Sequence, residues 1–420
     1  MFTFVRITVQ SAYTLFPVWT LMRISTPEFI ALMAMLVATV ALSIDAMLPA
    51  LPNIALELTP NHTNQAQLIL SSFILGMALG TFVMGPLSDS FGRKNIIYFG
   101  ASVYIISSTL CMFAPNLETI VVARVLQGIG AAAPRVVSQA LIRDLYSGRE
   151  MARISSFIMI IFSLVPAVAP LLGAGLISVF DWRAIFVTFI LFVVMSTIWT
   201  GIRITEPLKP EMRVPFSVQT FWAALTEISS LGIVRTSIIT LIFSYGILFT
   251  TILLVQPIFD QFFARADSFP LWFALIAVLS ASASFVNAML VMQMGMRRLI
   301  STALRVQIIW SFLMLLLFQC GIISGAWGFA IFVFWIFGLF FQTGMTLGNL
   351  TALAMEPLGH IAGTGASVIS AVATLGSVAI ATIIGQFFDG TPLVMIIGIF
   401  VLAFCGAYSA HRLQRFERRH

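Results

Sequence analysis

The segment GPLSDSFGRK, from Gly85 to Lys94, is a short polar turn between two long apolar stretches, Leu68–Leu87 and Ile96–Phe113. A helix needs about 20 mostly apolar residues to cross the hydrocarbon core of a bilayer, and both stretches approach that length. The turn itself holds two glycines, one carboxylate and two basic residues. This pattern predicts two membrane-crossing helices joined on one side of a bilayer.

The same alternation of apolar span and short polar turn runs through the chain. Of the 420 residues, 60% are hydrophobic and only 9% are charged, whereas a soluble domain has about 25% charged residues. Long unbroken apolar runs favour helices over barrel strands, which would alternate at period two. We therefore predict an all-α membrane protein whose twelve transmembrane helices are Phe29–Leu51, Leu68–Leu87, Ile96–Phe113, Thr119–Ile142, Ile154–Val179, Trp182–Ile202, Thr236–Phe259, Phe269–Met292, Ala303–Ile323, Trp327–Ala354, Ile361–Phe388 and Thr391–Ala410.

The basic residues predict the orientation of these spans. With the N-terminus inside, 18 of the 22 Lys and Arg residues fall in inner segments, and only Arg183 and Arg265 fall in outer loops. Cytoplasmic loops carry such an excess of basic residues. We therefore expect both termini to be cytoplasmic.

A long polar interruption divides the chain into two halves of six spans. We expect a cytoplasmic leader over 1–28, which has no good spanning helix, and a basic cytoplasmic tail over 411–420. Between them lie a bundle over 29–203, a central cytoplasmic loop over 204–235 and a second bundle over 236–410. The turn FGRK after the second span is echoed by GMRR after the eighth, as expected for duplicated halves.

Composition also excludes several classes of partner. The net charge of +6 comes from basic residues in short loops rather than from a basic stripe, so nucleic acid is not indicated. The three cysteines are scattered inside spans without metal-ligand spacing, and no nucleotide-binding GxxxxGK[ST] segment is present. We expect a monomer in the bilayer that uses no metal or cofactor.

Four motifs resemble those of a known family. GPLSDSFGRK is similar to the cytoplasmic loop signature of the major facilitator superfamily, ARVLQGIGAAA (Ala123–Ala133) to its fourth-helix signature, and PAVAPLLGAG (Pro166–Gly175) to its fifth-helix antiporter signature. SIDAMLPALP (Ser43–Pro52) resembles the Bcr/CflA drug-resistance branch, which RDLY at Arg143 and DWRAIF at Asp181 also fit.

This resemblance implies the major facilitator fold and a function. The chain would exchange protons for hydrophobic small molecules or antibiotics, exporting them across a bacterial inner membrane by alternating access. The proton gradient would supply the energy. A proton or solute symporter on the same fold is the close alternative, which the fifth-helix motif argues against. A membrane receptor or membrane-embedded enzyme is a weaker alternative. Such a protein would need a buried catalytic cluster of His, Asp or Glu, but the four histidines lie in loops, at span ends or in the tail.

The loop motif predicts a conformational latch. Gly85 and Gly92 allow close helix approach and a tight turn, and Asp89 can pair with an arginine such as Arg93 or cap a helix N-terminus. Loop charges that merely hold orientation are the alternative. The family has a basic residue where this chain has Ser90, so its charge network would be thinner.

The fifth-helix motif predicts a hinge and seal. Pro166 and Pro170 remove backbone hydrogen bonds inside an apolar helix, and Gly173 lets a partner helix come close. An ordinary packing kink is the alternative. The family has glycine where this chain has Ala169, which restricts that approach.

Ionisable residues deep in spans are costly and mark function. Asp45 and Arg124 fall at matching depth in the outer half of the membrane, so we expect them to pair or to exchange partners. Burial favours a protonated carboxylate and a nearby arginine favours an ionised one, so Asp45 could bind and release a proton while Arg124 tunes it. A static ion pair is the alternative.

Arg135 follows Arg124 by eleven residues, about three helical turns, so the two arginines share a face with Gln127. We expect this stripe to line a central cavity in which Arg135 binds an anionic or carbonyl group, or pairs with Asp89 or Asp144. Snorkelling of Arg135 to the interface is the alternative.

The second half has no deeply buried charge. Substrate contacts are expected among its polar and aromatic side chains, although packing is the simpler role for each. With Asp45, Gln127 and Arg135, the candidate contacts are Tyr245, Phe249, Gln256, Gln342 and Asn349.

Overall fold

The computed structural model describes residues 24–214 and 217–415, and every regular element in these ranges is helical. The first half holds α1 (Thr26–Asp45), α3 (Leu68–Phe91), α4 (Arg93–Met112), α5 (Leu117–Leu145), α6 (Gly148–Val179) and α7 (Ala184–Arg203). The second half holds α9 (Gly232–Pro257), α10 (Phe269–Ser280) with α11 (Ser282–Met294), α12 (Met296–Gln319), α13 (Gly325–Met355), α14 (Ala362–Gln386) and α15 (Leu393–Arg415).

These helices confirm the predicted membrane fold. Eleven stretches of the described chain are long and apolar enough to cross a bilayer, and one of them, Gly325–Gln386, has 62 residues and contains both α13 and α14. The described ranges therefore hold twelve spans. The expected leader lies mostly in 1–23, outside the described residues.

The first span differs from the prediction. The α-helix stops at Asp45, and the chain continues through a 3₁₀ turn (Leu48–Ala50) into the short helix α2 (Leu51–Leu58). Pro49 and Pro52 explain the break, because each lacks the backbone N–H that a continuous helix would need. Asp45 is thus placed at the end of a helix.

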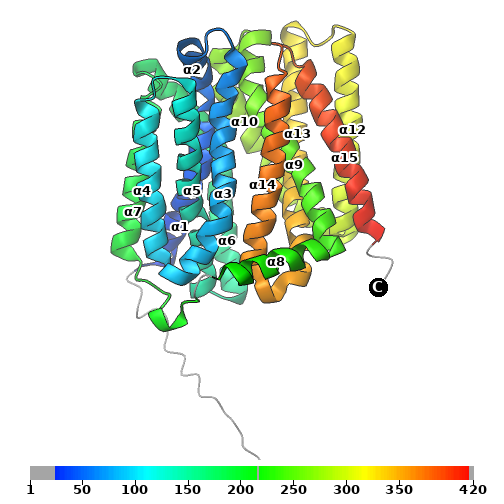
Figure 1. Ribbon diagram of the computed structural model, residues 1–420. Coiled ribbons are helices and arrows are strands. Elements are labelled where there is room, and N and C mark those ends of the chain that lie inside the picture. Colours follow the sequence, from blue (N-terminus) through cyan, green and yellow to red (C-terminus); the bar gives the residue numbers. More distant parts are fainter. Residues whose placement is uncertain (1–23, 215–216, 416–420) are drawn as a thin grey trace, which may run out of the picture.

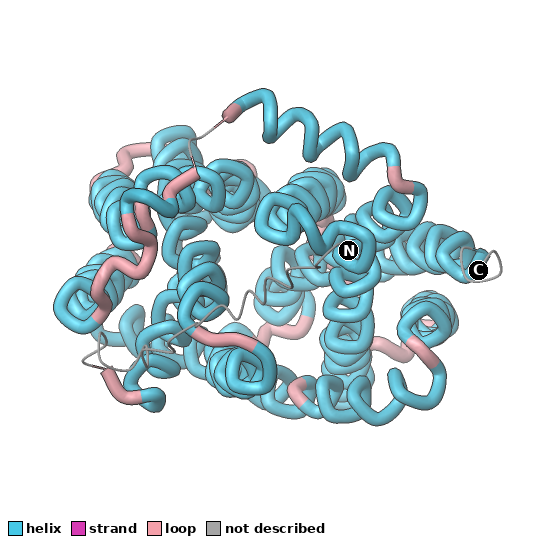
Figure 2. Tube along the Cα trace, turned by 90° about the horizontal axis from the view of Figure 1, so that it is seen from below, coloured by secondary structure: helices cyan, strands magenta, loops and turns pink. Residues whose placement is uncertain are grey.

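The helices form two groups that stand side by side. In Figure 1 the spans run roughly parallel, with α4, α5 and α7 on the left and α12, α13 and α15 on the right. The amphipathic helix α8 (Val218–Ser230) lies across the lower edge, and Figure 2, seen from below, shows it lying flat while most other helices appear end-on. The end of the molecule that carries α8 is called the α8 side below. The two groups touch where α3 packs against α14 and α6 against α10.

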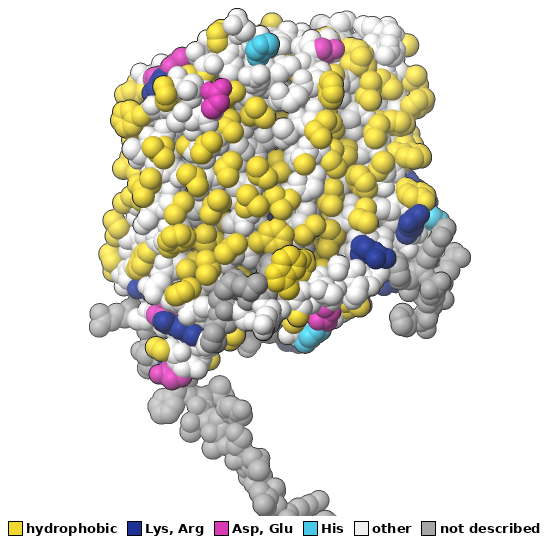
Figure 3. Space-filling model, viewed as in Figure 1, with side chains coloured by type: hydrophobic (Ala, Val, Ile, Leu, Met, Phe, Trp, Pro, Cys, Tyr) yellow, Lys and Arg dark blue, Asp and Glu magenta, His cyan; other side chains and the backbone are white. Residues whose placement is uncertain are grey.

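The surface matches a bilayer. Figure 3 shows apolar side chains over the broad middle of the molecule, with charged side chains gathered at its two ends. Large apolar residues such as Val122, Leu191 and Ile309 are exposed in the described chain, as expected where the surrounding solvent is lipid.

Close contact between α3 and α5 organises the first half. A Cβ placed on Gly76 would lie 1.9 Å from the Val125 carbonyl oxygen, and one on Gly128 would lie 2.1 Å from that of Phe73. Only glycine permits this approach. It brings the neighbouring Arg124 directly against the backbone of α3.

Candidate functional site

Arg124 is completely buried among α1, α3 and α5. Its Nε donates to the Ile69 carbonyl at 3.0 Å and its Nη2 to the Ser43 carbonyl at 3.0 Å. Its Nη1 donates to Gln127 Oε1 at 2.6 Å, and its guanidinium carbon lies 4.3 Å from the centre of the Phe73 ring. The planar fork of arginine suits this divergent set of partners.

Gln127 belongs to the same cluster. It is fully buried, and its Nε2 donates to Ser108 Oγ at 2.7 Å. The Ser43 hydroxyl and the Tyr104 hydroxyl lie 2.5 Å apart beside it. The interpretation of Gln127 as a cavity-lining residue is therefore wrong for this conformation, because both ends of its amide are engaged inside the helix bundle.

Asp45 does not pair with Arg124, which corrects the expected ion pair. Its side chain is 5% exposed and makes no hydrogen bond or ion pair with any described residue. Arg124 reaches the same depth but takes the carbonyl of Ser43 instead. Ser43 and Asp45 are two residues apart on α1, so their side chains point about 200° apart around the helix. Because Ser43 faces Tyr104 and Arg124, the Asp45 side chain points away from both.

The fifth-helix motif packs directly beside Asp45. Pro166 and Pro170 lie inside α6, which continues through both. A Cβ on Gly173 would lie 2.1 Å from the carbonyl oxygen of Ala46, the residue that follows Asp45. The glycine therefore fixes α6 against the break in the first span.

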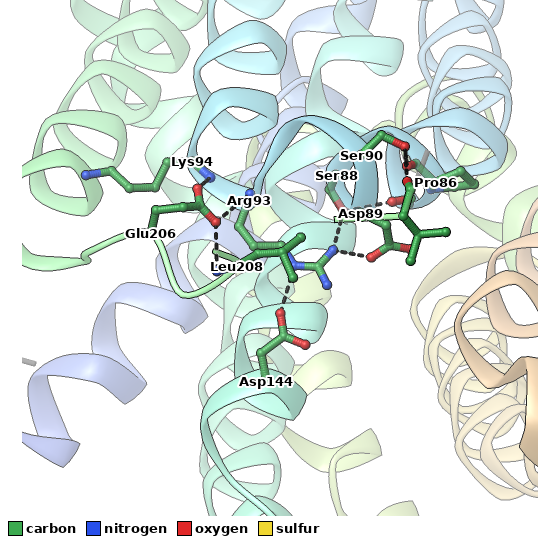
Figure 4. A network of polar contacts seen from close by, with 11 residues as sticks. Pro86, Ser88, Asp89, Ser90, Arg93, Lys94, Asp144, Glu206 and Leu208 are labelled. Carbon is green, nitrogen blue, oxygen red and sulfur yellow. Dashed lines mark hydrogen bonds and ion pairs between the residues drawn. The ribbon is translucent and has the colours of Figure 1, made fainter. Parts of the chain in front are cut away.

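On the α8 side, Arg93 forms a buried charge network (Figure 4). Its side chain is 3% exposed and donates from Nη1 to Asp89 Oδ1 at 2.5 Å and to Ser88 Oγ at 2.7 Å. Its Nε donates to Asp144 Oδ2 at 2.8 Å. The expected pairing of Asp89 with an arginine is present. Asp144, which with Asp89 is one of the two carboxylates predicted as partners of Arg135, is joined to Arg93 instead.

Sequence reasoning missed Glu206, which caps α4. Its carboxylate accepts from the backbone N–H groups of Arg93 at 3.0 Å and Lys94 at 2.9 Å, as Figure 4 shows. A carboxylate is favoured at a helix N-terminus, where amide groups lack partners. The only signal was an acidic residue next to Pro207, directly after the sixth span.

The central loop folds back over the same turn. Ser90 Oγ donates to the Val214 carbonyl at 2.7 Å, and Val214 N–H donates to the Asp89 carbonyl at 3.2 Å. Gly92 turns the chain with a φ of +94°, a conformation that favours glycine. Ser90, where the family has a basic residue, thus binds the loop through neutral hydrogen bonds.

The DWRAIF motif closes the opposite end of the first half. Arg183 donates to Glu57 Oε1 at 2.5 Å and to Asp181 Oδ2 at 2.7 Å, and Trp182 Nε1 donates to Glu57 Oε2 at 2.7 Å. The hydrogen bond that Arg183 donates to Glu57 raises the pKa of the Arg183 guanidinium above its usual value. These contacts hold α2 against the start of α7.

A cavity of about 220 Å³ separates the halves on the α8 side. Arg135 and Tyr245 line it from opposite halves, and Gly85, Asp89 and Arg93 contribute to its wall. A second pocket of about 180 Å³ lies at the other end, where Gln67, Gln256 and Asp260 line it.

The remaining predicted contacts do not line the first cavity. Phe249 is buried and stacks on Tyr245 with 5.7 Å between ring centres. Gln342 donates to Thr346 within α13, and Asn349 donates to Asn287 of α11. The predicted binding set is therefore divided among separate environments in this conformation.

Comparison with known proteins agrees with this architecture. The sequence model of one protein family, the Major Facilitator Superfamily, matches residues 32–381 of this chain. The chain belongs to this superfamily.

Members of the drug-resistance branch are among its relatives. This transporter is 30% identical to a bicyclomycin resistance protein homolog of Haemophilus influenzae over 349 residues, 83% of this chain and 86% of the relative. It is 35% identical to the multidrug resistance protein MdtL of Citrobacter koseri over 147 residues, 35% of this chain and 37% of the relative. The crystal structure of a D-xylose-proton symporter shares the fold, with a TM-score of 0.72 and 15% identity over 93% of this chain and 97% of that one.

The superfamily assignment confirms the resemblance seen in the motifs. This major facilitator chain is a transporter rather than an enzyme, and its membrane helices fit that role. Within the described residues no group of three or more His, Cys, Asp or Glu side chains could hold a metal ion.

Proposed function

We propose that this transporter exports hydrophobic small molecules, antibiotics among them, in exchange for protons. The names of its relatives support efflux as the direction: one is a bicyclomycin resistance protein homolog and another a multidrug resistance protein. The fifth-helix motif supports antiport over symport.

The observation that carries the proposal is the environment of Asp45. A carboxylate buried without a fixed cation has no static ion pair to maintain, so it is free to take up and release a proton. It also lies where α1 ends and where Gly173 of α6 makes its closest approach. Protonation of Asp45 is thus coupled to the packing of the two helices that change partners when access alternates.

Arg124 serves this site indirectly. It holds the backbone of α1 through the Ser43 carbonyl and so positions the helix end that carries Asp45. The Arg93 network and Glu206 form the latch that keeps the α8 side in one arrangement.

The test is Asp45→Asn in the purified full chain, reconstituted into proteoliposomes with a fluorescent pH indicator. Chloramphenicol and bicyclomycin are added, and proton movement is recorded. We expect the variant to fold and insert normally but to lose drug-driven proton movement. Asp267→Asn, which changes an exposed carboxylate in the outer loop, is the matched control.

Unchanged drug-driven proton movement in Asp45→Asn would remove Asp45 from the coupling mechanism. Movement of protons in the same direction as the drug would replace antiport by symport.

We further propose that the chain works as a monomer in a bacterial inner membrane with the α8 side facing the cytoplasm. The excess of basic residues in the segments on that side supports this orientation. The cavity lined by Arg135 would then receive substrate from inside the cell.

A further inference from the structure

The cavity on the α8 side carries more positive charge than its own residues balance. Three arginines, Arg93, Arg135 and Arg143, and one carboxylate, Asp89, line it. Arg93 is already neutralised, because it forms ion pairs with both Asp89 and Asp144. The charges of the other two arginines are left over.

Arg135 and Arg143 have almost no protein partners. Within residues 24–214 and 217–415, Arg135 donates from Nη1 only to the Met77 sulfur at 3.4 Å, and a thioether is a weak acceptor. Arg143 makes no hydrogen bond or ion pair with any described residue. The two lie eight residues apart on α5, which places them about 80° apart around the helix, and both side chains line the same cavity. Ten N–H donors, five on each guanidinium, are thus nearly unused.

The second half presents a complementary surface. Gly363 and Thr364, in the first turn of α14, line the cavity, and this helix has no side-chain cap at its N-terminus. Ser367, one turn further along, is 8% exposed, lines the same cavity and has no hydrogen-bond partner among the described residues. The positive end of a helix dipole without a side-chain cap and an unpaired hydroxyl both favour an anion.

These elements come close together across the space between the halves. The Arg143 Nη2 atom lies 3.5 Å from where a Cβ on Gly363 would stand, so α5 reaches α14 at the edge of the cavity. A ligand held here would touch both halves at once. Such a ligand could bias the relative position of the halves, which a transported compound must do.

We propose that this cavity binds the anionic group of an organic compound, a carboxylate or a phosphate or sulfonate ester, between Arg135 and Arg143 on one side and Ser367 with the start of α14 on the other. This deepens the proposed function, on which it rests, by assigning negatively charged amphiphiles to the transported compounds. The volume of about 220 Å³ suits one compact aromatic or aliphatic acid.

The test compares two compounds that differ only in charge, 1-naphthoate and 1-naphthamide. Their binding to the purified full chain in phosphatidylcholine nanodiscs is measured by isothermal titration calorimetry. A charge-assisted contact is worth enough that naphthoate should bind at least about 10-fold more tightly than naphthamide. Arg135→Gln and Arg143→Gln should each weaken naphthoate about 10-fold and leave naphthamide unchanged. Arg149→Gln, which removes an exposed arginine outside the cavity, is the control and should bind naphthoate as the wild type does.

Equal binding of the two compounds, or wild-type binding of naphthoate by both arginine variants, would overturn the assignment. Two further arms separate the possible sources of the anion. Loss of naphthoate binding in phosphatidylglycerol nanodiscs would assign the cavity to a lipid headgroup. Displacement of naphthoate by equimolar inorganic phosphate would assign it to free phosphate. Either result would overturn a substrate role.

This measurement needs no proton gradient, so its outcome is independent of the Asp45 test. Naphthoate binding with no proton exchange would leave the anion site standing and remove antiport. Proton exchange with no naphthoate binding would leave antiport standing and remove the anion site.

Discussion

Replacing Gly173 by alanine tests whether the contact between α6 and the end of α1 matters. The added Cβ would lie 2.1 Å from the Ala46 carbonyl oxygen and 3.0 Å from its carbonyl carbon. Because both partners are backbone, no side chain can rotate away, and the helices must separate by about 1 Å. Overpacking of this kind costs about 1–3 kcal/mol.

Gly175→Ala is the matched control on the same helix. A Cβ at Gly175 meets nothing within 4 Å. Both substitutions gain the same helix propensity, about 1 kcal/mol for alanine over glycine. The difference between the two variants therefore isolates the steric cost at Ala46.

The assay is thermal unfolding of each purified variant in detergent, together with drug-driven proton movement in proteoliposomes. We expect Gly173→Ala to melt about 2–5 °C below Gly175→Ala. We also expect it to lose most transport, because the added methyl group displaces the end of α1, where Asp45 lies. Equal melting temperatures and equal transport for the two variants would refute the close contact and the role assigned to it.

Three further substitutions test the other parts of the site. Glu206→Gln should lower the stability of the chain by about 1 kcal/mol, because it removes a charge from the N-terminus of α4; melting temperature measures this, and the same loss in the exposed Glu211→Gln would contradict it. Arg124→Lys should reduce transport at least about 10-fold, because an ammonium cannot reproduce the three divergent bonds of the guanidinium; wild-type transport would show that the fork is not needed. Arg135→Lys should weaken transport of some compounds more than others at unchanged abundance on a quantified membrane blot, and wild-type transport of every compound would return Arg135 to interfacial snorkelling.

The membrane fold follows from local features of the amino-acid sequence. A spanning helix is a local property, since about 20 consecutive apolar residues suffice to define it, and each span could be found without knowing its neighbours. The motif around Gly85 and Asp89 was also local, and it pointed to the superfamily that comparison then confirmed. The same logic singled out Asp45 and Arg124, because a charge inside an apolar span is conspicuous wherever it occurs.

The partners of those charges depend on how the helices pack in three dimensions. Asp45 and Arg124 share a depth, yet the rotation of α1 about its axis gives Arg124 the Ser43 carbonyl instead of the carboxylate. Rotation depends on how the helices pack, and hydropathy does not encode it. The break after Asp45 could be suspected from Pro49 and Pro52, but its contact with Gly173 joins residues more than a hundred positions apart.

The latch and the cavity depended on the same kind of distant contact. Glu206 caps α4 although it follows Arg93 by 113 residues in the chain, and Arg143 approaches Gly363 across the two halves. The sequence marks Glu206 as an acidic residue beside Pro207, but no pattern of composition or periodicity says which helix it caps or which residue Arg143 approaches. Local hydropathy determines which residues face lipid and which are kept from it. Which neighbour each buried polar group finds depends on how the twelve helices are rotated and packed against one another.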